Sequence, residues 1–193
     1  MSLILLVCAL PVLASYFLYY GVRPSTRSNY GQLIEPMRPI LPVSVRDLQQ
    51  RPGTLEQLRG HWLLISVADG ACDARCEGHL LLQRQLRESL GKEMDRVVWV
   101  WLIADATPPP VALQPALRQA TVLHVARADL QRWLEPQPGA RLDDHLYVVD
   151  PQGHWMLRFP PELDLAHAAR AKRDLDRLLR ASAAWDKPAN TAH

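Results

Sequence analysis

Two cysteines separated by three residues, Cys72 and Cys76, have the most distinctive chemistry in this 193-residue sequence. They follow a Gly-Ala pair, and His79 lies three residues further on. On a helix, positions four apart share one face, so the two sulfurs would lie close together. Such a pair can close as a disulfide, or its two thiolates can bind a soft metal ion such as Cu(I). A third interpretation is that both cysteines simply pack inside a helix.

The segments on either side of the cysteines predict a strand that leads into a helix. Residues 61–69 form an apolar run that is typical of a buried strand. Leucines recur at four-residue spacing in the segment 71–90, and Gly91 is suited to end a helix there. We then expect Cys72 in the first helical turn, where free backbone N–H groups and the helix dipole stabilise a thiolate.

The rest of the sequence predicts further strands and helices in alternating order. We expect strands at 43–47, 96–105 and 121–126, short helices at 54–60, 111–120 and 128–135, a hairpin of 145–150 and 154–159, and a final helix at 164–182. Buried central strands joined by crossover helices indicate a mixed central sheet with helices on both faces. A two-cysteine motif at a strand-to-helix turn, followed by a hairpin and a closing helix, is the thioredoxin-like order. We therefore predict an α/β, thioredoxin-like three-layer fold over residues 43–183.

A histidine is a suitable third ligand for a metal ion held by two cysteines. His145 begins a predicted strand, and in a thioredoxin-like fold the loop before it faces the helix that carries the cysteines. Asp143 or Asp144 would then orient the imidazole ring. His79 is the alternative, but along a helix it would lie about 10 Å from Cys72, too far for both to bind one ion. We therefore expect the two cysteines and His145 as the metal ligands.

The amino-terminal segment differs in character from the rest. Residues 3–22 carry no charged side chain and are numerous enough for a helix to span a bilayer, with aromatic residues at the far end. We expect a transmembrane anchor here, followed by a polar, proline-rich tether at 23–42, and a flexible tail at 184–193. The alternatives are a signal peptide cleaved after Ala14 and a lipid anchor on Cys8.

The charges of the sequence bear on two questions, whether the protein binds nucleic acid and on which side of the membrane its globular domain lies. The net charge of +2, without a basic stripe interleaved with aromatic residues, argues against nucleic-acid binding. Arg23, Arg27 and Arg38 follow the apolar segment, and the positive-inside rule would place the globular domain in the cytoplasm. The chemistry of the cysteine pair favours the opposite, periplasmic side.

These motifs together resemble those of the Sco family, or SenC-like proteins. The resemblance rests on the single apolar span, the proline-rich tether, "GHWLLISVADGACDARC", "DDHLYVVDPQG" and the terminal helix, and covers roughly residues 30–182. Members of that family are membrane-anchored, thioredoxin-like proteins that bind copper and assist the assembly of cytochrome c oxidase. The resemblance implies Cu(I) ligation by Cys72, Cys76 and His145.

The function implied by the resemblance is assistance in cytochrome c oxidase assembly, by Cu(I) delivery or by thiol reduction through Cys72 and Cys76. A metallochaperone is then a better description than an enzyme. The implied partners are the membrane and a respiratory oxidase subunit or assembly factor, with the globular domain on the periplasmic side of the inner membrane, on a single-pass anchor. Two alternatives are a general thiol–disulfide oxidoreductase with Cys72 as the attacking thiol, and a non-catalytic, membrane-tethered binding module.

Overall fold

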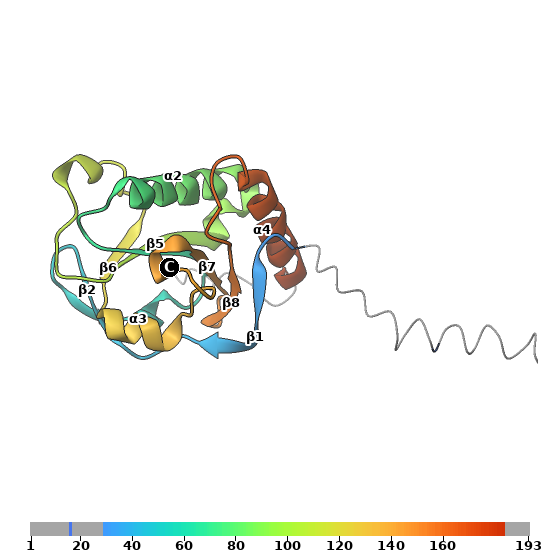
Figure 1. Cartoon of the computed structure of the whole chain (residues 1–193), viewed down its shortest axis with the longest axis horizontal. Coiled ribbons are helices and arrows are strands. Elements are labelled where there is room, and N and C mark those ends of the chain that lie inside the picture. The colour runs from blue at the N-terminus through green and yellow to red at the C-terminus, as the bar shows by residue number, and fades with distance from the viewer. Residues whose placement is uncertain (1–15, 17–28, 184–193) are drawn as a thin grey trace, which may run out of the picture.

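The computed structural model describes Tyr16 and residues 29–183 (Figure 1). Its strands are β1 (Gln32–Pro39), β2 (Ser44–Asp47), β3 (Pro52–Thr54), β4 (Trp62–Ala68), β5 (Val97–Ile103), β6 (Thr121–His124), β7 (Leu146–Val149) and β8 (His154–Arg158). The α-helices in this part of the chain are α2 (Ala74–Ser89), α3 (Arg127–Trp133) and α4 (Ala168–Ser182), and 3₁₀ turns lie at Leu55–Leu58, Gly91–Arg96, Val111–Leu113 and Leu142–Asp144.

The strands form one mixed sheet with the order β1-β8-β7-β4-β5-β6-β2-β3. The pairs β4–β5 and β5–β6 are parallel, and the other neighbouring pairs are antiparallel. The predicted central strands and the hairpin of β7 and β8 are therefore confirmed. The carboxyl ends of the three parallel strands meet at one edge of the sheet, where Asp69, Asp105 and Val125 lie in the loops that follow.

Helices cover both faces of the sheet, as Figure 1 shows. Successive residues of β4 point to opposite faces, as in any strand. Leu63 packs in the core cluster that contains Leu130 of α3. Leu64 packs in the opposite cluster, with Leu82 of α2 and Leu175 of α4. The three-layer, thioredoxin-like arrangement predicted from the sequence is therefore confirmed for the described domain.

Strand β1 lies inside the segment that we expected to be a tether. It pairs antiparallel with β8, with Pro39 opposite His154 and a register irregularity earlier in the strand. Prolines 36 and 39 are tolerated because β1 is the last strand on its side of the sheet, where a missing N–H removes no ladder bond. The sheet thus begins before residue 43, the expected start of the domain.

Two segments that we expected to be short helices contain only 3₁₀ turns. In the segment 54–60, Thr54 belongs to β3 and its side chain makes no capping hydrogen bond. In the segment 111–120, the turn ends at Leu113. Pro115 explains this early end, because proline lacks the N–H that would continue the helical hydrogen bonds.

Several predictions fall outside the described residues. They are the transmembrane anchor at 3–22, of which only Tyr16 is described, the start of the tether, the tail at 184–193, and the alternatives at Ala14 and Cys8. Among the residues that are described, no helix has the length and apolar character needed to cross a membrane. The anchor therefore stays a prediction.

Candidate functional site

The two cysteines lie at the carboxyl-terminal edge of the sheet, Cys72 in the turn between β4 and α2 and Cys76 in the first turn of α2. Cys72 and Cys76 form a disulfide, with an S–S distance of 2.00 Å and Cα atoms 5.1 Å apart. Both belong to an apolar cluster that includes Trp99 and Trp101, and each cysteine is only 5% exposed. The spacing therefore does permit a disulfide, and the bond is largely covered by the hydrophobic core.

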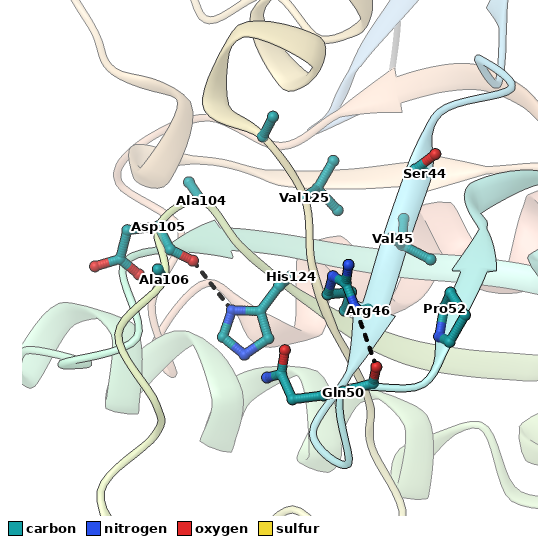
Figure 2. A pocket seen from close by; sticks show the side chains of 11 residues that line it. Ser44, Val45, Arg46, Gln50, Pro52, Ala104, Asp105, Ala106, His124 and Val125 are labelled. Atoms are coloured by element: carbon teal, nitrogen blue, oxygen red, sulfur yellow. Dashed lines mark hydrogen bonds between the residues drawn. The ribbon is translucent and has the colours of Figure 1, made fainter.

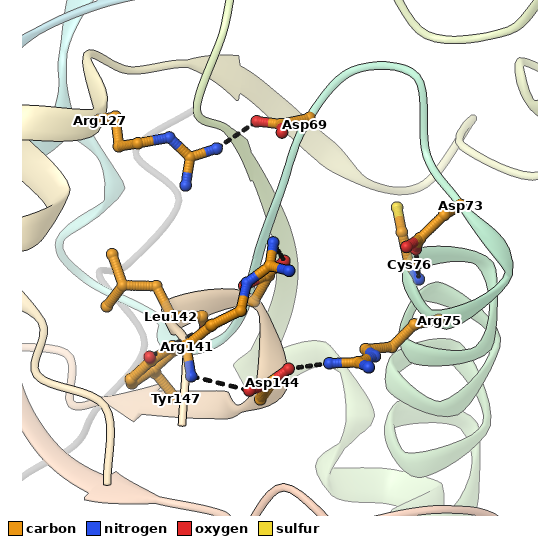
Figure 3. Close-up of polar contacts among 10 residues, drawn as sticks. Asp69, Asp73, Arg75, Cys76, Arg127, Arg141, Leu142, Asp144 and Tyr147 are labelled. Atoms are coloured by element: carbon orange, nitrogen blue, oxygen red, sulfur yellow. Dashed lines mark hydrogen bonds and ion pairs between the residues drawn. The ribbon is translucent and has the colours of Figure 1, made fainter. Parts of the chain in front are cut away.

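Helix α2 begins later than the sequence predicts. Cys72 has a φ of 45°, in the left-handed region, and its N–H donates to the Asp69 carbonyl at 3.1 Å. Asp73 is the N-cap, and its Oδ1 accepts the Cys76 N–H at 2.9 Å. Figure 3 shows both residues at the start of the helix. The prediction that Cys72 lies in the first helical turn is wrong, because aspartate is a strong N-cap residue, a signal already present in the sequence.

The turn before the cysteines is held by the loop that follows β5. The Gly70 N–H donates to Oδ1 of Asp105 at 2.8 Å. A Cβ at Gly70 would lie 1.7 Å from the Thr107 carbonyl oxygen, so a larger residue does not fit without a backbone shift. Burial alone would raise the pKa of Asp105, but hydrogen bonds from Thr107 and Gly70 outweigh it and lower the pKa. Asp105 is therefore an ionised carboxylate that holds the cysteine turn through its hydrogen bond from Gly70.

Two ion pairs flank the cysteine turn and join segments that are distant in sequence (Figure 3). Arg75, which stands between the cysteines, contacts Asp144 in the loop before β7. Asp144 also accepts the backbone N–H of Arg141 at 2.7 Å. Asp69, just after β4, contacts Arg127 at the start of α3. The loop before β7 therefore does face the cysteine helix, as expected, and Asp144 makes the contact.

His145 follows Asp144 directly but is completely buried. Its Nδ1 lies 2.8 Å from the Phe159 carbonyl oxygen, and its Nε2 accepts the backbone N–H of Gln137 at 3.1 Å. Because a carbonyl oxygen can only accept, Nδ1 carries the proton, and both ring nitrogens are engaged. Burial lowers the pKa of His145, which keeps the ring neutral at pH 7.

The three predicted metal ligands have other partners in this structure. The cysteines are bonded to each other, and His145 is bonded to backbone groups. Over the part of the chain that the structure describes, no group of three or more Cys, His, Asp or Glu side chains is placed to hold a metal ion. A site of two cysteines and His145 would require reduction of the disulfide and release of the Gln137 N–H. This ligand set stays a prediction.

His79, the alternative third ligand, lies on α2 one turn after Cys76 and is 7% exposed. Burial, followed by the positive charge of Arg75, lowers the pKa of His79. With Arg75 and Asp144 it lines a cavity of about 530 Å³ between α2 and the loop after β8. It is therefore a neutral, buried imidazole that adjoins the cysteine site.

Comparison with known proteins adds family evidence to this geometry. A family model described as "Transmembrane-like, thioredoxin-like, C-terminal domain" matches residues 62–182. A comparison of the sequence with curated proteins finds no significant match.

Solved Sco proteins share the fold. Copper-bound yeast Sco1 has a TM-score of 0.59 at 14% identity, covering 77% of this chain and 96% of that chain. Apo Sco1 from Thermus thermophilus has a TM-score of 0.55 at 21% identity, covering 80% and 99%. BsSco has a TM-score of 0.53 at 13% identity, also covering 80% and 99%. At these identities the likeness shows a common fold, so the Sco-like fold implied by the sequence motifs is confirmed. Because the family model covers more than half of the chain, the protein belongs to the family of transmembrane-like, thioredoxin-like C-terminal domains.

Proposed function

We propose that this chain assists cytochrome c oxidase assembly as a membrane-anchored thioredoxin-like protein whose Cys72 and Cys76 cycle between dithiol and disulfide. The observation that carries the proposal is the disulfide between these cysteines at the strand-to-helix turn. BsSco, which has the same fold, is described as containing a disulfide switch and as a member of the Sco family of cytochrome c oxidase assembly proteins. The Cys72–Cys76 disulfide and the fold shared with BsSco therefore both support this proposal.

The proposed reaction is reduction of a disulfide in an oxidase subunit or assembly factor. The Cys72 thiolate attacks one sulfur of the client disulfide, a mixed disulfide forms, and the other client sulfur leaves as a thiolate. The Cys76 thiolate then attacks Cys72, which releases the second client thiolate and closes the Cys72–Cys76 bond. Two electrons pass from the pair to the client, and a separate dithiol reductant must restore the reduced pair.

Each cysteine suits one of these two roles. Cys72 lies in the turn before the helix, where its N–H donates to the Asp69 carbonyl, and because it is only 5% exposed, this turn, rather than α2, must open for a client to reach the sulfur. Cys76 is inside the helix, where its N–H is bonded to the Asp73 carboxylate. Exchange through a mixed disulfide needs one thiol that attacks the client and a second thiol that resolves the intermediate.

Trapping of the mixed disulfide tests the proposal and the order of attack. We expect full-length protein with Cys76→Ser to accumulate a mixed disulfide with an oxidase subunit or assembly factor, and Cys72→Ser to accumulate little. A general oxidoreductase would instead form mixed disulfides with many unrelated proteins. Cells with both cysteines replaced by serine should lose oxidase activity, and unchanged respiration would support a non-catalytic binding module.

Cu(I) delivery is the second candidate, because yeast Sco1 of the same fold is solved with copper bound. In the reduced protein, two thiolates would bind Cu(I) as cargo, and His145 would join only by giving up its bond from Gln137. Anaerobic Cu(I) titration of the full-length protein should show one ion bound, with binding lost in Cys72→Ser and Cys76→Ser. His145→Ala should weaken binding and His79→Ala should not, and equal affinities for the two variants would remove His145 from the site.

The membrane anchor and the periplasmic position of the globular domain are part of the same proposal. They are supported by the uncharged segment 3–22 and by the disulfide, which persists in oxidising compartments. An alkaline phosphatase fusion after residue 190 should be active. An inactive fusion would place the domain in the cytoplasm, as the positive-inside rule suggests.

A further inference from the structure

A second pocket lies at the carboxyl ends of β5 and β6, beside β2, and neither cysteine contributes to it (Figure 2). Its volume is about 570 Å³, which is in the range of small-molecule sites. Its polar groups come from Ser44 and Arg46 of β2, Gln50 of the next turn, Asp105 and His124. In open α/β sheets, the carboxyl ends of parallel strands are the usual place for ligands.

The positive charge of the pocket comes from Arg46. Arg46 and His124 are directly opposite each other in the antiparallel pair of β2 and β6, so their side chains share one face. Ser44, two residues before Arg46, lies on the same face. Arg46 makes one long hydrogen bond, from Nη1 to the Gln50 carbonyl at 3.3 Å, and is exposed. Its other N–H groups remain available for an anion.

His124 supplies a hydrogen-bond acceptor. Its Nδ1 lies 3.0 Å from the Asp105 carbonyl oxygen, and because that oxygen only accepts, Nδ1 is the protonated nitrogen. In the neutral ring, Nε2 then carries the lone pair, and Figure 2 shows this nitrogen facing the Gln50 side of the pocket. No described residue donates to Nε2. The Asp105 carboxylate is turned to the Gly70 N–H and away from His124.

The remaining lining is apolar. Val45, Ala104 and Val125 are buried, and Pro52, Ala106 and Ala126 also line the pocket. A matching ligand therefore needs an anionic group for Arg46, a hydrogen-bond donor for His124 and an aliphatic body. A phosphate matches less well, because the pocket offers one arginine, and the lone pair on His124 repels an oxygen that carries no proton.

We propose that this pocket binds a small carboxylate that carries a hydroxyl or amino group beside the carboxylate and an aliphatic side chain. The carboxylate binds the Arg46 guanidinium, a pairing for which arginine is well suited. The hydroxyl or amine donates to Nε2 of His124, and the aliphatic part contacts the apolar lining.

Isothermal titration of full-length protein with a matched series of compounds tests this assignment. The probe is 2-hydroxy-4-methylpentanoate, compared with 4-methylpentanoate, with the primary amide of the hydroxy acid, and with inorganic phosphate. We expect saturable binding of the hydroxy acid, about tenfold weaker binding of the amide and a smaller loss without the hydroxyl. Tighter binding of phosphate, or no saturable binding of the hydroxy acid, would overturn the proposal.

Variants locate the binding in the pocket. Arg46→Gln should weaken binding of the hydroxy acid about tenfold or more. His124→Leu should remove the difference between the hydroxy acid and 4-methylpentanoate, because the acceptor for the hydroxyl is gone. Arg118→Gln is the matched control, since Arg118 is also exposed but lies outside this pocket. Equal losses in Arg46→Gln and Arg118→Gln would show general charge attraction and refute the site.

Discussion

Replacing Gln83 by leucine should weaken the attachment of the cysteine helix to the sheet. Gln83 is completely buried on the face of α2 that meets β4 and β5. Its Oε1 accepts the Ser66 hydroxyl at 3.0 Å, and its Nε2 donates to the carbonyls of Leu64 at 2.7 Å and Val100 at 3.1 Å. A leucine of similar volume fills the space but makes none of these bonds.

The expected magnitude follows from these contacts. Three hydrogen bonds at about 1 kcal/mol each give a loss of about 3 kcal/mol. The leucine side chain recovers about 1 kcal/mol, because its apolar surface favours burial. Gln83→Leu should therefore lower the free energy of unfolding by about 2 kcal/mol. Ser66→Ala should lower it by about 1–2 kcal/mol, because it leaves Oε1 of Gln83 without a donor.

Urea denaturation of both single variants and the double variant measures the shared bond. Both substitutions remove the same Ser66–Gln83 bond, so the double variant should lose about 1 kcal/mol less than the sum of the single losses. Gln85→Leu is the control, since Gln85 is exposed on the same helix and should change stability by less than about 0.5 kcal/mol. If the single losses simply add, the Ser66–Gln83 bond does not contribute to stability.

Three further predictions concern groups around the site. Burial lowers the pKa of His79 and of His145, so the unfolded chain binds more protons than the folded one. The free energy of unfolding is therefore unaffected by these two histidines above about pH 6.5, where both states are neutral. It falls as the pH drops toward their folded-state pKa values, because protonation favours the unfolded chain. The urea midpoint should decrease as the pH is lowered from about 8 to about 5, a range that brackets the ordinary histidine pKa. A midpoint that does not change with pH would contradict this. Gly70→Ala should lower the melting temperature and disturb the cysteine turn. The control Gly78→Ala places its methyl group in open space within α2 and should stabilise the protein by up to about 1 kcal/mol. Equal effects of the two substitutions would show that the contact at residue 70 is unimportant. Asp73→Ala should cost about 1 kcal/mol in urea denaturation through loss of the N-cap, and Asp73→Ser should recover most of it if capping is the reason.

Local patterns predicted most of the fold, because strand and helix formation depend on residues close together in sequence. The apolar run 61–69 corresponds to β4, in which every residue is buried. The leucine spacing predicted α2, although it gave no indication that Gln83 would be the polar residue of the core face. Strand β1 was missed because its prolines argue against a strand, and only its position at the edge of the sheet makes them acceptable.

The position of Cys72 and Cys76 at a strand-to-helix turn in a thioredoxin-like sheet could be predicted from the sequence alone. The groups that surround the two cysteines could not, because they come from distant segments. Arg75 meets Asp144 across 69 residues of sequence, whereas His145, the next residue, points into the core and bonds to backbone groups. Asp144 ends a 3₁₀ turn and His145 begins the extended segment, so the backbone changes conformation between them and a shift of one residue exchanges a site residue for a core residue. Sequence spacing can place a loop beside the cysteines, but the packing of distant segments selects the side chain that faces them.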